Sequence, residues 1–213
     1  MNAKFFRLAL CAALLAAPTF ASAIIDFAGN AAGSGSITGT ATTSTGTSIL
    51  IDTLTGIGTP LNAGSTSVTG GALTFSASGG SYSGGVYTYT SGTFEIAGTD
   101  TTAGASGELL GGTISSLTVN IGGSITLVTG TDTFDNTALA TYFGLPTTAG
   151  NVTNGSVHLS NITGGTGGSY SASTFSTDIP DSTVPEPTSI LFLGTVLIGV
   201  SMLVRRARQP QQN

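Results

Sequence analysis

The chain has 213 residues, room for about one domain once its two ends are set aside, and carries 10 acidic and 5 basic residues. All five basic residues lie at the ends, and no Lys or Arg stands between Ile24 and Thr183. This body therefore cannot neutralise phosphates, which excludes nucleic-acid binding and opposes contact with anionic lipid headgroups. The single cysteine, Cys11, lies outside the body, which excludes disulfides, thiolate chemistry and cysteine-ligated metals there.

The first 23 residues predict a secretory signal peptide. Lys4 and Arg7 form a basic start, and residues 8–17 form an apolar run. Pro18 then breaks the helix, and Ala21 and Ala23 provide the small residues of the signal-peptidase site. The apolar run is too short to span a bilayer, which needs roughly 20 residues. We expect signal peptidase to cleave after Ala23, which makes Ile24 the first residue of the mature chain.

Residues 24–163 predict a Gly-, Ser- and Thr-rich β body. Apolar and polar residues alternate in several stretches, which predicts strands at 73–77, 86–90, 94–96, 117–121 and 157–161. Gly-Gly pairs between such stretches are turn candidates, and they begin at 70, 79, 84, 111 and 122. Gly-Thr pairs show no fixed period, which argues against a regular β-helix. We expect an antiparallel β-sandwich or jelly roll of about eight to twelve short strands, with one short helix over 136–143.

The body offers few groups for catalysis. His158 is the one histidine, and it lies in a predicted strand without a Gly-x-Ser-x-Gly elbow. Two carboxylate pairs could serve a glycosidase, but solvated turn residues are the favoured interpretation (Asp132 with Asp135; Asp178 with Asp181). No Asp-x-Asp-x-Asp-Gly loop is present, although structural calcium stays open. We expect no catalytic residue, cofactor or metal site.

The C-terminal part predicts a tether followed by a membrane segment. Residues 164–183 are rich in Gly, Ser and Thr and predict a flexible linker. Residues 188–204 carry no charge, and their number meets the lower limit of about 17 for a transmembrane helix. Arg205, Arg206 and Arg208 follow directly. Because basic residues stay cytoplasmic, we expect the body outside the membrane and the tail inside.

Between tether and membrane segment stand Val184, Pro185, Glu186 and Pro187. The two prolines keep this stretch out of a helix, so it is extended and accessible to a protease. The motif, the short apolar stretch and the arginine-rich end together resemble the PEP-CTERM sorting signal of Gram-negative bacteria. The resemblance implies that an exosortase, a membrane-embedded transpeptidase-like enzyme, recognises the motif, and that the arginines stop transfer. It also implies an inner-membrane intermediate with a periplasmic body, followed by delivery to the cell surface or outside.

Three functions stay open for the body. PEP-CTERM proteins are associated with exopolysaccharide and biofilm production, so the resemblance favours a non-enzymatic surface or extracellular-matrix protein. The alternative is a carbohydrate- or ligand-binding module that uses exposed aromatic rings (candidates Tyr82, Tyr87, Tyr89 and Tyr170). A threonine-rich ice-binding face is a variant that the lack of a period disfavours. An enzyme is least favoured, because it needs acidic residues that converge in a cleft.

Overall fold

The computed structural model describes residues 23–31, 34–133, 136–145, 150–152 and 155–183. The chain divides into two compact units, and the described residues all lie in the unit that runs from Ser22 to Val184. The strands and the helix have these bounds: β1 Ile24–Asn30, β2 Ser36–Gly39, β3 Thr43–Ile57, β4 Gly64–Ser78, β5 Ser81–Ser83, β6 Val86–Tyr89, β7 Ser91–Asp100, β8 Ala105–Asn120, β9 Ser124–Thr133, α2 Thr137–Phe143, β10 Gly150–Val152, β11 Gly155–Gly164 and β12 Tyr170–Thr183.

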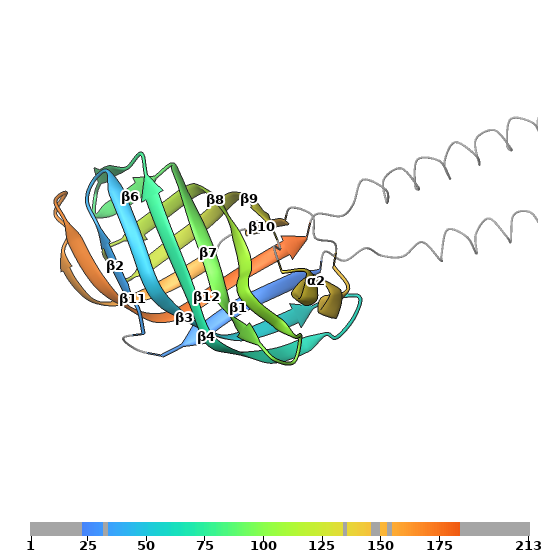
Figure 1. The fold of residues 1–213 in the computed structure, drawn as a ribbon. Coiled ribbons are helices and arrows are strands. Elements are labelled where there is room, and N and C mark those ends of the chain that lie inside the picture. The colour runs from blue at the N-terminus through green and yellow to red at the C-terminus, as the bar shows by residue number, and fades with distance from the viewer. Residues whose placement is uncertain (1–22, 32–33, 134–135, 146–149, 153–154, 184–213) are drawn as a thin grey trace, which may run out of the picture. The chain divides into compact units, whose positions relative to one another are not determined.

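The strands form one antiparallel sheet that closes on itself into a barrel (Figure 1). The wall follows the order β9, β11, β12, β1, β3, β4, β7, β8, and pairing of β8 with β9 completes the circle. β2 pairs with the same two neighbours as β1, namely β12 and β3. The predicted β-rich class is confirmed, but the sandwich or jelly roll is wrong, because one closed wall replaces two layers. Closure gives each wall strand a partner on both sides.

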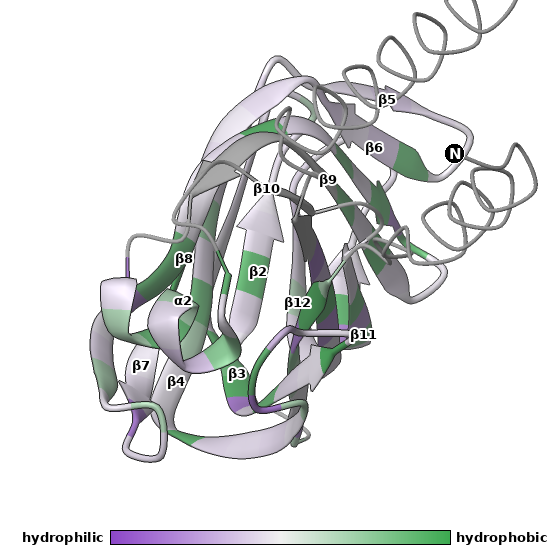
Figure 2. Ribbon diagram, turned by 90° about the vertical axis from the view of Figure 1, so that its right-hand side faces the viewer, coloured by the Kyte–Doolittle hydropathy of each residue, from purple (hydrophilic) through white to green (hydrophobic). Residues whose placement is uncertain are grey.

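Alternation along the strands sends apolar side chains into the barrel. In β1, Ile25 and Phe27 are fully buried, whereas Ile24 and Asp26 on the other face are partly exposed. Figure 2 shows apolar bands alternating with polar ones along the strands. An eight-stranded barrel is just wide enough for side chains to fill it. Each buried aliphatic or aromatic side chain contributes about 1.5–3 kcal/mol, so the filled interior holds the wall closed.

Several strands are longer than the sequence pattern predicts. β3 and β4 have 15 residues each, and β8 has 16. The predicted turns at Gly70-Gly71 and Gly111-Gly112 are wrong, because both pairs lie inside strands. The register of β4 shifts between Thr69 and Ala72, and a Cβ on Gly71 would collide with the carbonyl oxygen of Ile51. Gly71 therefore serves close backbone approach within the wall.

The other Gly-Gly pairs connect strands as predicted. Gly79-Gly80 joins β4 to β5, Gly84-Gly85 joins β5 to β6, and Gly122-Gly123 joins β8 to β9. Gly84 and Gly85 both have positive φ angles, of 59° and 87°. Two consecutive positive φ angles are typical of the tight turns that match the twist of a hairpin.

Residues 164–183 do not form the predicted tether. β12 occupies most of this range and pairs with β1 over seven residues, from Ile24 opposite Ser182 to Asn30 opposite Ser176. The polar composition misled the prediction, because two of its hydroxyl residues, Thr174 and Thr177, are buried. The barrel therefore runs from Ile24 to Thr183 and ends directly before Val184.

The predicted helix is confirmed as α2. The side chain of Asn136 accepts a hydrogen bond from the Leu139 N–H (3.2 Å), and Gly144 ends the helix with a φ of 71°. Leu139 and Phe143 are fully buried. The Leu61 N–H donates to the Phe143 carbonyl oxygen (3.1 Å), so the helix and the β3–β4 loop together cap one end of the barrel (Figure 1).

Candidate functional site

Three buried tyrosines close the barrel at the end where the β2–β3 turn lies. Tyr87 and Tyr89 alternate along β6, which points both rings inward, and Tyr170 begins β12. All three are at most 3% exposed. The ring centroids of Tyr87 and Tyr170 are 4.7 Å apart, and the partly buried Tyr82 packs against Tyr87 at 4.6 Å. The prediction that these rings form an exposed sugar platform is therefore wrong for Tyr87, Tyr89 and Tyr170.

Hydrogen bonds occupy the hydroxyl groups of these tyrosines. Tyr89 donates to the Thr40 carbonyl oxygen (2.6 Å), and its hydroxyl lies 3.2 Å from that of Tyr170. The Tyr170 hydroxyl is also 2.6 Å from Ser44 Oγ, which is itself buried. Burial raises the pKa of Tyr89 and of Tyr170 above the ordinary value, so both stay neutral. This network holds β6, β12 and the β2–β3 turn together at this end of the barrel.

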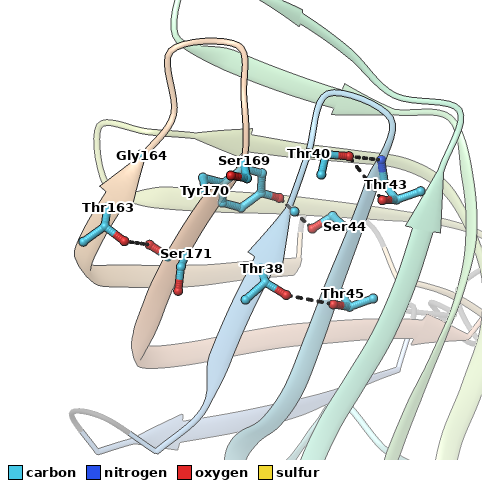
Figure 3. Close-up of a pocket in the computed structure, with 11 residues that line it drawn as sticks. Thr38, Thr40, Thr43, Ser44, Thr45, Thr163, Gly164, Ser169, Tyr170 and Ser171 are labelled. Atoms are coloured by element: carbon cyan, nitrogen blue, oxygen red, sulfur yellow. Dashed lines mark hydrogen bonds between the residues drawn. The ribbon is translucent and has the colours of Figure 1, made fainter.

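Beside the network, a groove of about 500 Å³ opens between β2, β3, β11 and β12 (Figure 3). Its lining consists of Gly, Ser, Thr and Tyr without a charged residue (Thr38, Gly39, Thr40, Thr43, Ser44, Thr45, Thr163, Gly164, Ser169, Tyr170 and Ser171). Thr38 Oγ1 lies 3.1 Å from Thr45 Oγ1, and Thr40 Oγ1 accepts from the Thr43 N–H (3.2 Å). The groove thus presents hydroxyl groups that the strands already hold in place.

A second groove, of about 490 Å³, shares Thr45 with the first and crosses β3, β4, β7 and β8. Its lining is again rich in hydroxyl groups and also includes two carboxylates (Thr45, Gly46, Thr47, Thr74, Phe75, Ser76, Thr93, Phe94, Glu95, Glu108 and Gly112). Phe75 covers Gly46, where a Cβ would collide with the ring. Glycine at this point lets the ring fill the interior while the outer face stays polar.

Both grooves follow one row of exposed hydroxyl side chains that crosses seven strands. Each member stands directly opposite the next in the strand register, and we call the set the hydroxyl row (Thr163, Ser171, Thr38, Thr45, Ser76, Thr93 and Thr113). All of them are exposed. Because neighbouring strands lie about 4.8 Å apart, the row extends over roughly 29 Å. The two grooves contain every member except Thr113.

Of the two predicted carboxylate pairs, the structure tests Asp178 with Asp181 and separates them. Asp178 is exposed on the outer face of β12, whereas Asp181 is fully buried, because a spacing of three puts strand residues on opposite faces. Asp135 lies outside the described residues. Asp178 instead forms a hydrogen bond with Asp26 of β1, diagonally across the two strands, since Asp178 stands opposite Ala28 and Asp26 opposite Pro180. Burial, the hydrogen bond and the charge of Asp178 together raise the pKa of Asp26 to about 6.

His158 lies exposed within β11, opposite Ser176 of β12. Across the described ranges, His, Cys, Asp and Glu side chains form no group of three or more that could hold a metal ion. Within the same ranges, no helix combines the length and the apolar character that crossing a bilayer requires.

The predicted sorting and processing residues fall almost entirely outside the described residues. Ala23 is the exception, and it is buried at the start of the barrel. The others are those of the sorting motif, the arginine stop and the signal-peptidase site (Val184, Pro185, Glu186 and Pro187; Arg205, Arg206 and Arg208; Ala21). Their roles stay predictions from the sequence.

Comparison with known proteins identifies a motif that directly follows the barrel in the sequence. Residues 183–208 match the family model of the PEP-CTERM protein-sorting motif. The match begins at Thr183, the last residue of β12. No curated protein and no solved structure matches the chain. The chain therefore carries a PEP-CTERM sorting motif, which implies processing by an exosortase-type membrane enzyme and export to the cell envelope or surface.

Proposed function

We propose that the chain is a non-enzymatic surface or extracellular-matrix protein whose barrel binds neutral polysaccharide along the hydroxyl row. The observation that carries the proposal is the unbroken line of exposed hydroxyl groups across seven strands, with two grooves along it. The association of PEP-CTERM proteins with exopolysaccharide and biofilm agrees with such a ligand. This retains the carbohydrate-binding alternative but moves its contacts from tyrosine rings to threonine and serine hydroxyls.

Hydroxyl groups suit this ligand because each offers one donor and two acceptor positions. Within the hydroxyl row, Thr38 and Thr45 are already bonded across strands, at 3.1 Å. Such a pair keeps further donor or acceptor capacity for sugar hydroxyls. Since the strands already order the side chains, binding loses little additional side-chain entropy. A rigid, regular surface of this kind favours a polymer with repeating hydroxyl groups.

Charge favours a neutral polymer over an acidic one. The body carries no Lys or Arg between Ile24 and Thr183, so it has no side-chain cation for uronate or sulfate groups. The second groove also contains Glu95 and Glu108, which would repel an acidic chain.

The proposed route to the surface begins with signal-peptidase cleavage before Ile24. Residues 188–204 then hold the protein in the inner membrane, with Arg205, Arg206 and Arg208 on the cytoplasmic side. The exosortase-type enzyme acts at Pro185–Pro187. The body passes from the periplasmic face to the cell surface or outside, where it meets the polysaccharide.

Sedimentation with microcrystalline cellulose, a neutral polymer, tests the binding, and polygalacturonate serves as the acidic comparison. The test variant is Thr45→Val with Ser76→Ala and Thr93→Val in the hydroxyl row. The matched control, Thr55→Val with Ser65→Ala and Ser67→Ala, removes hydroxyls from β3 and β4 away from the grooves.

We expect the wild type and the control to sediment with cellulose, the row variant to lose about tenfold in affinity, and none to bind polygalacturonate. Tenfold corresponds to about 1.4 kcal/mol. Equal binding by all three proteins, or binding to the acidic polymer alone, would contradict the proposal.

A further inference from the structure

We propose that the helix-capped end of the barrel rests on the outer surface of the inner-membrane lipid bilayer while the sorting segment is still attached. This rests on the membrane intermediate of the proposed function. The surface consists of Ile57, Pro60, Leu61 and Tyr142, and we call it the end patch. Ile57 and Leu61 are the large hydrophobic residues that the described part of the chain leaves exposed, at 51% and 54%. Both lie at the same end.

The loop that carries Leu61 is held firmly outward. The Leu61 N–H donates to the Phe143 carbonyl oxygen (3.1 Å), and the Asn62 side chain donates to the Tyr142 carbonyl oxygen (2.8 Å). Gly58 and Asn62 adopt positive φ angles of 64° and 45°, a conformation that bends the loop sharply. A loop fixed in this way presents Leu61 to the surroundings instead of folding it into the core.

The chain leaves the barrel at this same end. Ile24 of β1 stands opposite both Ile57 of β3 and Ser182 of β12, so the end of β12 lies one strand away from the end of β3, which leads into the end patch. Four residues, 184–187, separate β12 from the uncharged stretch 188–204. Even when fully extended, four residues span at most about 14 Å. A membrane-held sorting segment therefore keeps this end of the barrel close to the lipid.

The chemistry of the end patch fits a lipid interface. Leucine and isoleucine side chains insert at the boundary of headgroups and acyl chains, and tyrosine is enriched there. No charged residue occurs in 56–64 or 136–145, so anionic headgroups meet no carboxylate from these segments. Asp100, which ends β7 before the nearby β7–β8 turn, is fully buried and accepts hydrogen bonds from the N–H groups of Thr102 and Ala103.

Fluorescence quenching by lipids with a nitroxide headgroup tests the proposal in the full chain. The chain carries Glu186→Ala to retain the sorting segment and Cys11→Ala to leave one engineered thiol, and is reconstituted into phosphatidylcholine vesicles. A fluorophore is attached at Ala63→Cys in the end-patch loop or at Thr42→Cys, beyond the opposite end of the 15-residue β3. The two ends of β3 lie about 45 Å apart.

We expect the label at position 63 to be quenched at least about fivefold more than the label at 42. Ile57→Asp with Leu61→Asp should lower the quenching at 63 by about half or more, because carboxylates leave the interface. Ser81→Asp with Ser83→Asp, at the far end, should leave it unchanged. Equal quenching at 63 and 42 would overturn the proposal. Unchanged quenching in the Ile57 and Leu61 variant would also overturn it, because the short tether alone would then hold position 63 near the lipid. Neither readout depends on processing, so a failure of exosortase cleavage would refute the proposed function separately.

Discussion

The two ends of the barrel are closed by different chemistry. At one end, Tyr87, Tyr89 and Tyr170 fill the interior and bind polar groups through their hydroxyls. At the other, α2 inserts Leu139 and Phe143, and the β3–β4 loop packs against it. The tyrosine end turns hydroxyl groups outward beside a groove, whereas the helix end turns Ile57 and Leu61 outward. The barrel therefore has a polar end, beside which the proposed binding groove lies, and an end with exposed apolar side chains.

The largest effect is expected from truncating Phe143, the main side chain that fills the helix end of the barrel. Phe143→Ala should lower the free energy of unfolding by about 3–5 kcal/mol, because the ring is fully buried and leaves a cavity. Urea unfolding of the purified protein measures the loss. A change below about 1 kcal/mol would mean that α2 does not seal the barrel.

At the tyrosine end, Tyr89→Phe should lower the free energy of unfolding by a smaller amount. The change keeps the ring but removes the hydroxyl that donates to the Thr40 carbonyl oxygen (2.6 Å). Leaving this partly buried acceptor without its donor costs about 1–3 kcal/mol. The same unfolding experiment applies, with Tyr142→Phe as a control at the other end. If the two variants unfold alike, the tyrosine network does not stabilise its end.

The helix cap supplies a smaller effect. Asn136→Ala should lower stability by about 1 kcal/mol, because it removes the side-chain acceptor for the Leu139 N–H. Asn136→Asp keeps an acceptor but loses the amide donor to the Ser106 carbonyl oxygen (3.0 Å), so it should fall between wild type and alanine. Thermal unfolding of the three proteins ranks them, and an aspartate variant weaker than alanine would contradict this account of the cap.

The smallest expected effect is a pH dependence at the seam between β1 and β12. The pKa of Asp26 is raised from 3.8 to about 6, so the folded protein binds this proton more tightly than the unfolded chain does. Its contribution to stability is therefore full below about pH 4 and is lost as the pH rises through about 6. Asp26→Asn should flatten the stability profile between these values. An unchanged slope in urea titrations at pH 4, 5, 6 and 7 would contradict the raised pKa of Asp26.

Local features of the fold could be predicted from the sequence. Alternating residues indicated many of the strands, and Asn136 and Gly144 fitted the start and stop of α2. The sorting motif was recognisable because its three elements are contiguous. Each of these features is decided by neighbours within a few residues of one another.

Long-range features could not be predicted in the same way. Closure depends on the pairing of β8 with β9, and nothing local distinguishes a closed wall from two packed sheets. β12 looked like a tether because Thr174 and Thr177 face the interior, where an apolar residue would have signalled a strand. The hydroxyl row has no sequence period, since its regular spacing comes from the register of seven separate strands. The sequence does show Ser or Thr at outward-facing positions of these strands, but only the register shows that they stand in one row.

The most direct test of the account is the intact mass of the protein from membranes and from culture medium, for the wild type and for Glu186→Ala. We predict a released wild-type species that begins at Ile24 and ends within 184–187, so that it retains the whole barrel from β1 to β12. The Glu186→Ala protein should stay in the membrane and keep its C-terminus. A chain that extends to Asn213 in both proteins would contradict processing at the PEP-CTERM motif and leave a permanently anchored barrel.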